Sequence, residues 1–407
     1  MTRDEARARD AADPLRPLRD RFHLPKSTIY LDGNSLGALP RATAGRVAQA
    51  VTGEWGRDLI GSWNTHGWIG LPTRLAVGIA PLIGAAPDEV IVADSTSVNL
   101  FKLLVAGCTA RGERTSILTE PGNFPTDLYV ADGVARLLPG RRVRTVPAND
   151  IAAAIDGDTA VVLLTHVHYK SGAMHDMAVL TAAAHAQGAL VLWDLSHSTG
   201  AVPVDLSTCD ADMAVGCGYK YLNGGPGAPA FLYVARRLQD ALRSPLSGWM
   251  GHAAPFAFDD SYAPADGMRR FLCGTPPVLA MAALEAGIAT FDGVELQALF
   301  AKGRALGDAF VALVEAHCEG LTLLSPRDAT ARGSHVSFAH PDAYALCQAL
   351  IARGVIGDFR APDAIRFGFA PLYLGFEDVW RAVDVLRDIL ASRQFDRPEF
   401  RIRGAVT

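Results

Sequence analysis

Apolar and polar positions follow two different rhythms along this chain. From about residue 70 to residue 290, short apolar runs alternate with longer segments in which apolar residues recur every three or four positions. The short runs predict buried strands and the longer segments predict helices, so this part should consist of βαβ units with a mostly parallel sheet between helices. The clearest helix and strand pairs are 75–84 with 89–94, 97–107 with 115–120, and 178–188 with 189–194.

Beyond residue 290 the pattern changes. The expected elements there are a long helix at 296–318, a strand at 335–340, a helix at 343–354, a strand at 364–370 and a last helix. This order predicts a smaller α+β domain at 291–407 beside a large α/β domain at 51–290. Residues 1–50 are expected to form an arm and loop, because their LDGNSLG stretch carries the Gly and Asn residues of tight turns. We expect this arm to contribute to the small domain.

Composition indicates a globular protein with a small-molecule partner. The chain has 407 residues, of which 49% are hydrophobic and 20% charged, and its formal net charge is −5. Lys and Arg are scattered along the chain, so no nucleic-acid partner is expected. The N-terminal segment is heavily charged and no apolar run could span a bilayer, so we expect a cytoplasmic protein with no membrane partner. The 6 cysteines form no CxxC pair, which argues against a disulfide framework and a structural zinc site.

A single lysine, Lys220, stands between two tyrosines in the stretch GYKYLNGGPG at 218–227. It follows a strand-like apolar run and precedes glycines that let the backbone approach a bound molecule closely. Burial disfavours an ammonium ion, and a neutral amine can attack a carbonyl carbon to form a Schiff base. The alternative is a lysine that snorkels to the surface from the end of a strand.

Two further groups follow strands, at the edge where open α/β sheets bind their ligands. Thr96 and Ser97 begin the helix after the strand at 89–94, and the N–H groups of a helix N-terminus together with hydroxyls form a natural phosphate site. Asp194 ends the strand at 189–194, where a buried carboxylate needs a cation such as a protonated pyridine nitrogen. Each group taken alone could simply cap a helix or a turn.

Together, the helix-start hydroxyls, Asp194 and Lys220 supply what pyridoxal 5′-phosphate needs at its phosphate, ring nitrogen and aldehyde. At this point the sequence resembles the pyridoxal-phosphate enzymes of fold type I, which share the aspartate aminotransferase fold, and within them the kynureninase family. The resemblance implies an α/β, PLP-dependent transferase-like fold. The motifs that carry it are LDGNSLG at 31–37, DSTSVNLFKLL at 94–104, NFPTDLYV at 123–130, WDLSHSTG at 193–200, GYKYLNGGPG at 218–227, GWMGH at 248–252, GTPP at 274–277 and IRFGFAPLY at 365–373.

The resemblance implies roles for residues around the cofactor. Lys220 would hold pyridoxal phosphate covalently and move protons at the substrate Cα, Asp194 would pair with the ring nitrogen, and Tyr219 would act as an acid–base group. The other residues expected around the cofactor are Thr96, Ser97, Phe124, Asp127, Ser171, His197 and, from across a dimer interface, Trp249 and Thr275.

The resemblance also implies a reaction, the hydrolytic cleavage of the Cβ–Cγ bond of L-kynurenine to anthranilate and L-alanine, in a homodimer with its active site at the interface. Arg366 would bind the substrate carboxylate, with Ser35 as a further substrate contact. Trp63 would lie against the aromatic ring of the substrate. Together with Gly274 and Thr275, it resembles the bacterial form, which generally favours kynurenine over 3-hydroxykynurenine.

A metal hydrolase is an alternative of another class. Alternate residues of a strand point to one face, so His166 and His168 could chelate one ion, with His175 and Asp176 following closely. That set leaves Lys220 and the helix-start hydroxyls without a role, so the main interpretation includes no metal.

A cysteine desulfurase or a related lyase of the same fold is a nearer alternative. It would need a nucleophilic cysteine on a mobile loop, whereas Cys318 and Cys347 fall inside helical patterns. A tyrosine also precedes Lys220 where that family is expected to have histidine. A non-catalytic, cofactor-binding regulator would need a DNA-binding unit, and no basic helix-turn-helix pattern precedes the large domain.

Overall fold

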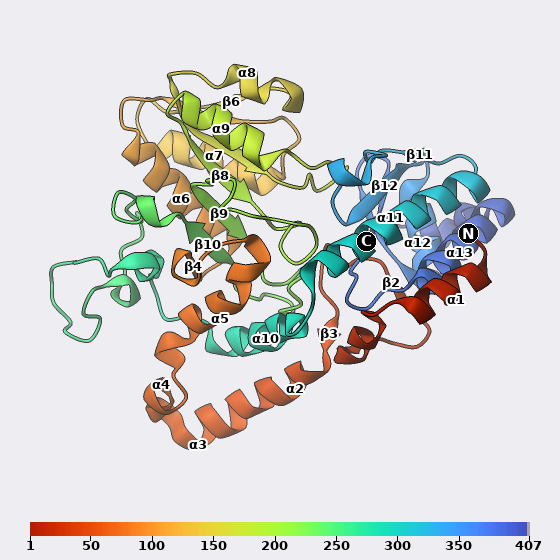
Figure 1. Ribbon diagram of the computed structural model, residues 1–407, viewed down its shortest axis with the longest axis horizontal. Helices are drawn as coiled ribbons and strands as arrows, with labels where there is room; N and C mark the ends of the chain where they lie inside the picture. The colour runs from red at the N-terminus through yellow and green to blue at the C-terminus, as the bar shows by residue number, and fades with distance from the viewer. Residues whose placement is uncertain (405–407) are drawn as a thin grey trace.

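A seven-stranded sheet forms the centre of the larger part of the molecule in this computed structural model, which describes residues 1–404 (Figure 1). The strands lie in the order β4, β10, β9, β8, β7, β5, β6. Only β10 runs antiparallel to its neighbours, so the mostly parallel sheet is confirmed. The bounds are β4 (Val90–Val92), β5 (Ser116–Thr119), β6 (Arg142–Thr145), β7 (Thr159–Thr165), β8 (Leu190–Asp194), β9 (Met213–Gly216) and β10 (Phe231–Val234).

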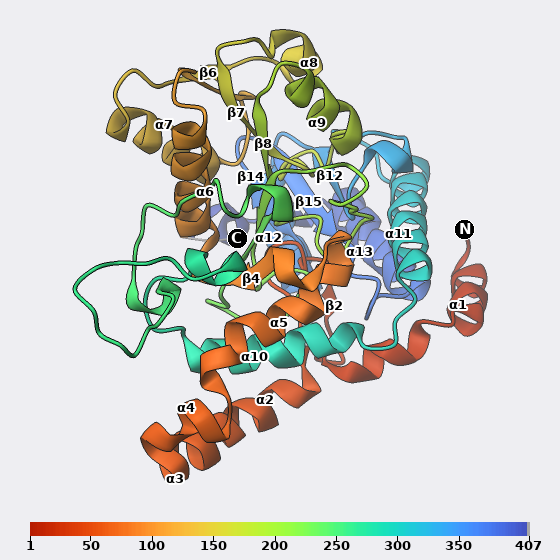
Figure 2. The ribbon, with the colours of Figure 1, turned by 60° about the vertical axis from the view of Figure 1, so that its left-hand side comes forward.

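Helices cover both faces of this sheet, as Figure 2 shows for α6 and α7 on one side and α9 on the other. Successive residues of β7 point to opposite faces, so Val161 packs with α6 and α7, and Val162 packs with the other helices. Both faces of the central strands are therefore apolar. The covering helices are α5 (Leu71–Ile79), α9 (Met177–Ala186) and α10 (Val278–Ile288) on one face, and α6 (Thr96–Ala110) and α7 (Pro125–Leu137) on the other.

The smaller part is built on a four-stranded antiparallel sheet in the order β11, β12, β15, β14. Its apolar face, which includes Val336 and Phe367, packs against three helices to form the core. On the opposite face, Arg366 contacts the larger part. The bounds are β11 (Thr322–Leu323), β12 (His335–Ala339), β14 (Asp358–Arg360), β15 (Ala364–Gly368), α11 (Leu296–His317), α12 (Ala343–Ala352) and α13 (Phe376–Ser392).

The N-terminal arm contains a helix that the sequence analysis did not predict, α1 (Arg3–Ala12), which packs against α13. It was missed because Ala6 is its only buried residue, so it has almost no apolar periodicity, and its start depends on a capping box between Thr2 and Glu5. Further along, two short strand pairs fix the arm. They are β1 (Phe22–His23) with β3 (Leu39–Pro40), and β2 (Ile29–Tyr30) with β13 (Val355–Ile356).

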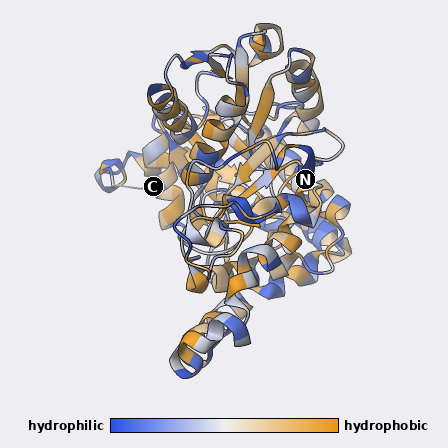
Figure 3. Ribbon diagram, turned by 90° about the vertical axis from the view of Figure 1, so that its left-hand side faces the viewer, coloured by the Kyte–Doolittle hydropathy of each residue, from blue (hydrophilic) through white to orange (hydrophobic). Residues whose placement is uncertain are grey.

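A projection at one end of the larger part follows the arm, as Figures 1 and 3 show. It is made of α2 (Arg41–Ala48), a π-helical turn (Gln49–Trp55), α3 (Gly56–Asp58) and α4 (Ser62–Thr65), and α2 packs against α10. The one remaining α-helix of residues 1–404 is the short α8 (Ile151–Ala154). Within that range, every helix is too short or too polar to cross a membrane. The domain boundaries near residues 50 and 290 stay predictions.

Candidate active site

A cavity of about 220 Å³ lies beyond the carboxyl ends of the central strands. It brings together most of the residues predicted to surround a cofactor, although they come from five separate segments of the chain. Its lining consists of Thr96, Ser97, Phe124, Thr126, Asp127, Thr165, Tyr169, Asp194, Ser196, His197, Tyr219 and Lys220.

The hydroxyls of Thr96 and Ser97 face this cavity from the first turn of α6. Ser95 is the N-cap, and its side chain accepts a hydrogen bond from the backbone N–H of Val98 at 3.4 Å. Because the cap uses Ser95, the next two hydroxyls and the positive end of the helix remain available to an anion. The turn itself is anchored by Asp94, whose carboxylate pairs with the fully buried ammonium of Lys102.

Two buried carboxyl groups lie on the other side of the cavity. Asp194, at the end of β8, accepts a hydrogen bond from the N–H of Ser196 at 2.7 Å, and Asp127 in α7 accepts one from the hydroxyl of Thr165 at 3.1 Å. Burial raises the pKa of Asp194. Burial also raises the pKa of Asp127 well above its usual value, and the like charge of Asp194 is the second cause. Asp127 Oδ1 is buried without a hydrogen-bond partner in the described structure.

Lys220 reaches the cavity from the loop after β9. Its Nζ lies 2.9 Å from Nε2 of His197 and 5.8 Å from the ring centroid of Phe124. Burial, and then the charge of Lys220, hold the pKa of His197 well below its usual value, so the imidazole is neutral and Nε2 can accept a hydrogen bond from the amine.

The LDGNSLG loop supports the backbone of this lysine. The N–H of Gly37 donates to the carbonyl of Tyr219 at 2.8 Å, and a Cβ at Gly37 would lie 2.3 Å from the carbonyl oxygen of Lys220. Only glycine allows the two backbones to approach so closely. The N-terminal loop and the lysine loop are therefore one structural unit.

Arg366 and Ser35, the predicted substrate residues, lie together on the small-domain side. Arg366 is 1% exposed and donates to Asp358 through Nε at 2.8 Å and through Nη2 at 2.5 Å. Its Nη2 also donates to Ser35 Oγ at 2.8 Å, and its Nη1 donates to the carbonyl of Tyr169 at 2.5 Å. Since Tyr169 lines the cavity, the guanidinium lies close to the space beside Lys220.

Six predicted residues do not line this cavity within one chain, namely Arg366 and Ser35, described above, and Ser171, Trp63, Trp249 and Thr275. Ser171 instead pairs with Nδ1 of His168 at 3.0 Å. Trp63 and Trp249 lie together, with ring centroids 6.5 Å apart. Thr275 follows a segment that is bonded to the Trp249 turn, because the N–H of Met250 donates to the carbonyl of Cys273 at 3.2 Å.

The histidines of the metal alternative have separate partners. β7 ends at Thr165, so His166 and His168 lie beyond the strand that was expected to align them. His166 pairs with Ser198 at 2.9 Å, His168 with the carbonyl of Gly122 at 2.8 Å, and His175 with Glu120 at 2.9 Å. Residues 1–404 contain no group of three His, Cys, Asp or Glu side chains placed to hold a metal ion.

Several residues of the site were missed by the sequence analysis. His335 on β12 is fully buried, lies 5.4 Å from His197 between ring centroids, and has no hydrogen-bond partner on either nitrogen in the described structure. Lys102, Asp358 and Arg360 were missed as well. Lys102 lies eight residues after Asp94, which precedes the helix, and Asp358 and Arg360 contact a residue more than 300 positions away, so local sequence patterns do not reveal these pairs.

Comparison with solved structures shows the fold. An apo cysteine desulfurase from Thermococcus onnurineus NA1 has a TM-score of 0.79 and 20% sequence identity, with 92% of this chain and 98% of that chain covered. A C-DES mutant with glycine covalently linked to its PLP cofactor has a TM-score of 0.81 and 17% identity, covering 91% of this chain and 99% of that one.

Comparison with curated sequences is more specific. A kynureninase from Burkholderia mallei (strain ATCC 23344) is 54% identical and one from Pseudomonas fluorescens is 51% identical, each covering 100% of both chains. A family model for the kynureninase C-terminal domain matches residues 299–386. The fold and the lysine-centred site define a pyridoxal-phosphate enzyme of fold type I. Within that class, the chain belongs to the kynureninase family.

The cavity fits pyridoxal phosphate on its own chemistry. The orphaned oxygen of Asp127 and the buried carboxyl of Asp194 call for a cationic N–H donor, which a protonated pyridine ring provides. The free hydroxyls at the start of α6 suit a phosphate, and the amine of Lys220 suits an aldehyde. The similarity to desulfurases concerns the fold alone, and Cys318 and Cys347 are both buried.

Proposed function

We propose that this protein catalyses the hydrolytic cleavage of L-kynurenine to anthranilate and L-alanine. The observation that carries the proposal is the full-length identity of 51–54% with curated kynureninases. The arrangement of Lys220, Asp194 and Arg366 around one space supports it, because this reaction needs a cofactor-binding amine, a partner for the ring nitrogen and a cation for the substrate carboxylate.

Bound pyridoxal phosphate supplies an electron sink that makes the bonds at the substrate Cα and Cβ easier to break. Thr96 and Ser97 would hold its phosphate at the positive end of α6. Asp194, with Asp127 beside it, would keep the ring nitrogen protonated, and Phe124 would lie against the ring face.

Lys220 would be the base that moves the proton at the substrate Cα. The neutral ring of His197, 2.9 Å from its Nζ, would orient the amine. Tyr219 would act in the later steps, because burial raises the pKa of its phenol and the group therefore retains a proton that it can donate.

Arg366 would bind the substrate carboxylate next to Ser35, on the side of the cavity that the small sheet supplies. A carboxylate held there would place the substrate Cα near Lys220. Trp63 would contact the aromatic ring of the substrate, and Ser171 would support the cofactor through a polar contact.

A homodimer would complete the site. Trp63, Trp249 and Thr275 lie outside the cavity of their own chain, which suits residues that reach the cavity of a partner. An aromatic row leads from Trp63 through Trp249 and Phe256 to Phe258, which is 77% exposed. We also propose a cytoplasmic location, since all 6 cysteines are free thiols, as is usual in a reducing compartment.

The test is an assay of the purified protein with pyridoxal phosphate and L-kynurenine that follows the fluorescence of released anthranilate. Lys220→Ala should lower turnover at least about 100-fold, the usual lower range for a lost acid–base group. Lys170→Ala, which removes an ammonium group that contacts the carbonyl of Ala361 and the carboxylate of Asp363, is the control and should retain turnover. If no anthranilate forms while other amino acids shift the cofactor absorbance, the substrate assignment is wrong.

A further inference from the structure

We propose that Arg360 is a second substrate-binding arginine, which shares the substrate carboxylate with Arg366 beside Ser35. The inference rests on the proposed function and adds a residue to its carboxylate site. Arg360 ends β14 opposite Ala364 of the neighbouring strand β15, and Asp358, two residues earlier in β14, lies opposite Arg366.

The guanidinium of Arg366 has little capacity left for a ligand. An arginine has five N–H donors, and Arg366 uses at least four of them on Asp358, Ser35 and the carbonyl of Tyr169. A substrate carboxylate that needs two parallel donors would therefore have to displace Ser35 or Tyr169, or take part of its hydrogen bonding from another residue.

Arg360 has the capacity that Arg366 lacks. Its side chain is 34% exposed, and its Nη2 lies 2.7 Å from Asp358 Oδ2 and 3.3 Å from Ser35 Oγ. Its Nη1 donates to the carbonyl of Phe359 at 3.0 Å, and within residues 1–404 its Nε makes no hydrogen bond. Both guanidinium groups thus meet at Ser35 Oγ, but Arg366 is buried, whereas Arg360 is partly open to solvent and keeps more unused donors within residues 1–404.

The charges of the cluster also favour an anionic ligand. Asp358 is 1% exposed, and Arg366 alone would neutralise it, so Arg360 adds a second positive charge. Burial, and then the charge of Asp358, raise the pKa of Asp32 to about 7, so this neighbouring carboxyl is largely neutral in mildly acidic solution. One positive charge is then left over, and a substrate carboxylate carries one negative charge.

The competing explanation is that Arg360 only stabilises Asp358. The two explanations differ in their dependence on the ligand, because a structural arginine affects every substrate equally, whereas a carboxylate-binding arginine affects only substrates that carry the carboxylate. The α-amide of L-kynurenine lacks that charge and keeps the rest of the molecule.

The experiment compares L-kynurenine with its α-amide in the holoenzyme and in the variants Arg360→Gln, Arg360→Met and Arg360→Lys. Arg360→Gln and Arg360→Met should raise KM for L-kynurenine about 10-fold, in the range of one hydrogen bond to a charged group, with KM for the amide within about 2-fold of wild type. Arg360→Lys should restore most of the lost affinity, because it keeps the charge.

Arg353→Met is the matched control, since Arg353 has a side chain that is 38% exposed and pairs with Asp388 at 3.0 Å elsewhere in the small domain. It should change neither KM. Melting temperature and the cofactor absorbance band show which variants are folded and hold the cofactor. If Arg360→Met does not fold, Arg360→Gln takes its place, because glutamine can still form a hydrogen bond with Asp358. Equal rises in KM for acid and amide, or no rise at all, would overturn the inference. Absence of anthranilate from the wild-type protein would instead refute the proposed function.

Discussion

At the scale of single residues, the site fixes the protonation state of its groups through burial. His197 and His335 are fully buried, and burial holds the pKa of each imidazole well below its usual value, so both rings are neutral at physiological pH. Burial, and then the charge of Asp194, raise the pKa of Asp127 well above its usual value. The two imidazoles are therefore ready to exchange hydrogen bonds with a cofactor without first changing charge.

Asp32→Asn tests the charge balance of the substrate side. Burial and Asp358 raise the pKa of Asp32 to about 7, above the value near 3.9 expected in the unfolded chain. The stability that this shift contributes is fully present below about pH 4 and is lost as the pH rises through about 7. As the pH rises from 4 to 9, the melting temperature of the wild-type protein should therefore fall relative to that of Asp32→Asn.

Curves that stay parallel over this range would contradict the raised pKa of Asp32. The charged groups that act on the same carboxyl are Asp358, Arg366 and Arg360.

The site residues that sequence reasoning found are those that follow strands. Thr96, Asp194 and Lys220 each come shortly after an apolar run, and the carboxyl ends of neighbouring strands converge in space. Arg360 and His335 were not found, because they contact Ser35 and His197 on distant segments of the chain, and no periodic pattern encodes which distant segments will meet.

At the scale of elements, periodicity predicted the long helices and buried strands well and the polar or very short elements poorly. α11 was expected at 296–318 and spans Leu296–His317, and α6 begins one residue before its expected start. In contrast, α1 and β14 gave no signal. A helix with one buried residue and a strand of three residues owe their existence to tertiary contacts, which local patterns do not record.

The turn before α6 depends on one ion pair, in which the lysine is buried and the carboxylate is partly exposed. Lys102 is fully buried and donates to the carboxylate of Asp94 and, at 2.7 Å, to the carbonyl of Phe271. It therefore ties the phosphate turn to the segment that leads to Thr275. Lys102→Met should destabilise the fold by about 3 kcal/mol, the lower range for a broken buried pair, and should also weaken pyridoxal-phosphate binding, measured by titrating the dialysed protein.

Lys302→Met provides the matched control. Lys302 forms another buried pair, with Asp13 at 2.7 Å, in the small domain and away from the cofactor cavity. This variant should lower the melting temperature to a similar extent and leave cofactor affinity unchanged. Equal cofactor affinity in both variants would show that Lys102 has a purely structural role.

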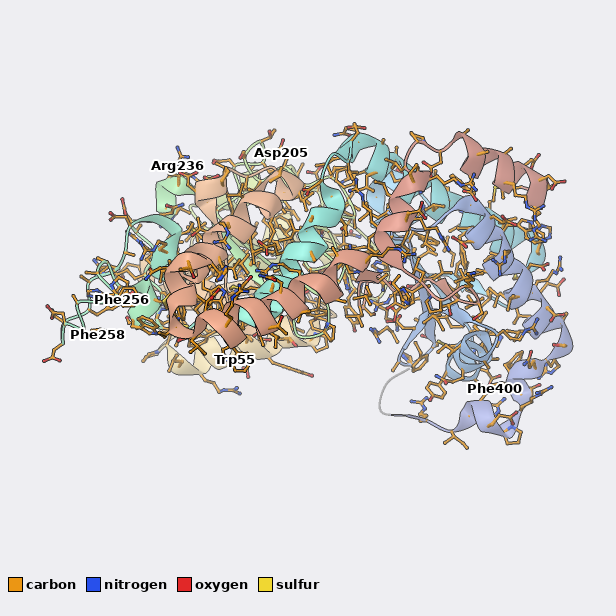
Figure 4. The ribbon with its side chains drawn as sticks, turned by 90° about the horizontal axis from the view of Figure 1, so that it is seen from below. Trp55, Asp205, Arg236, Phe256, Phe258 and Phe400 are labelled. Carbon is orange, nitrogen blue, oxygen red and sulfur yellow. The ribbon has the colours of Figure 1, made fainter. Side chains whose placement is uncertain are left out.

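At the scale of the whole molecule, exposed aromatic side chains gather at one end. Figure 4 shows Phe256 and Phe258 on the outermost loop and Trp55 on the projection, with exposures of 58%, 77% and 55%. Large exposed apolar side chains on outlying segments are typical of protein–protein contacts. Ring contacts connect Phe256 and Phe258 to Trp249, a residue expected to complete the site of a partner chain.

The double change Trp55→Glu with Phe258→Glu should convert the proposed dimer into monomers, because four charges would have to be buried in a symmetric interface. Sedimentation velocity measures the change in mass, and anthranilate release should fall in parallel as the partner residues are lost. Ile402→Glu is the control, since Ile402 is 74% exposed on the small domain. A wild-type protein that sediments as an active monomer would refute the dimer.

The pairing of β2 with β13 has a consequence for biosynthesis. Residues 29–30 pair with residues 355–356, and the same N-terminal segment continues into the loop whose Gly37 supports Tyr219 and Lys220. Residues 29–30 therefore wait for residues 355–356 to be made before they can be fixed in place. A nascent chain that already contains Lys220 but not residues 355–356 has no rigid cradle for the lysine, so the reactive amine is assembled into a working site only after the later segment has been synthesised.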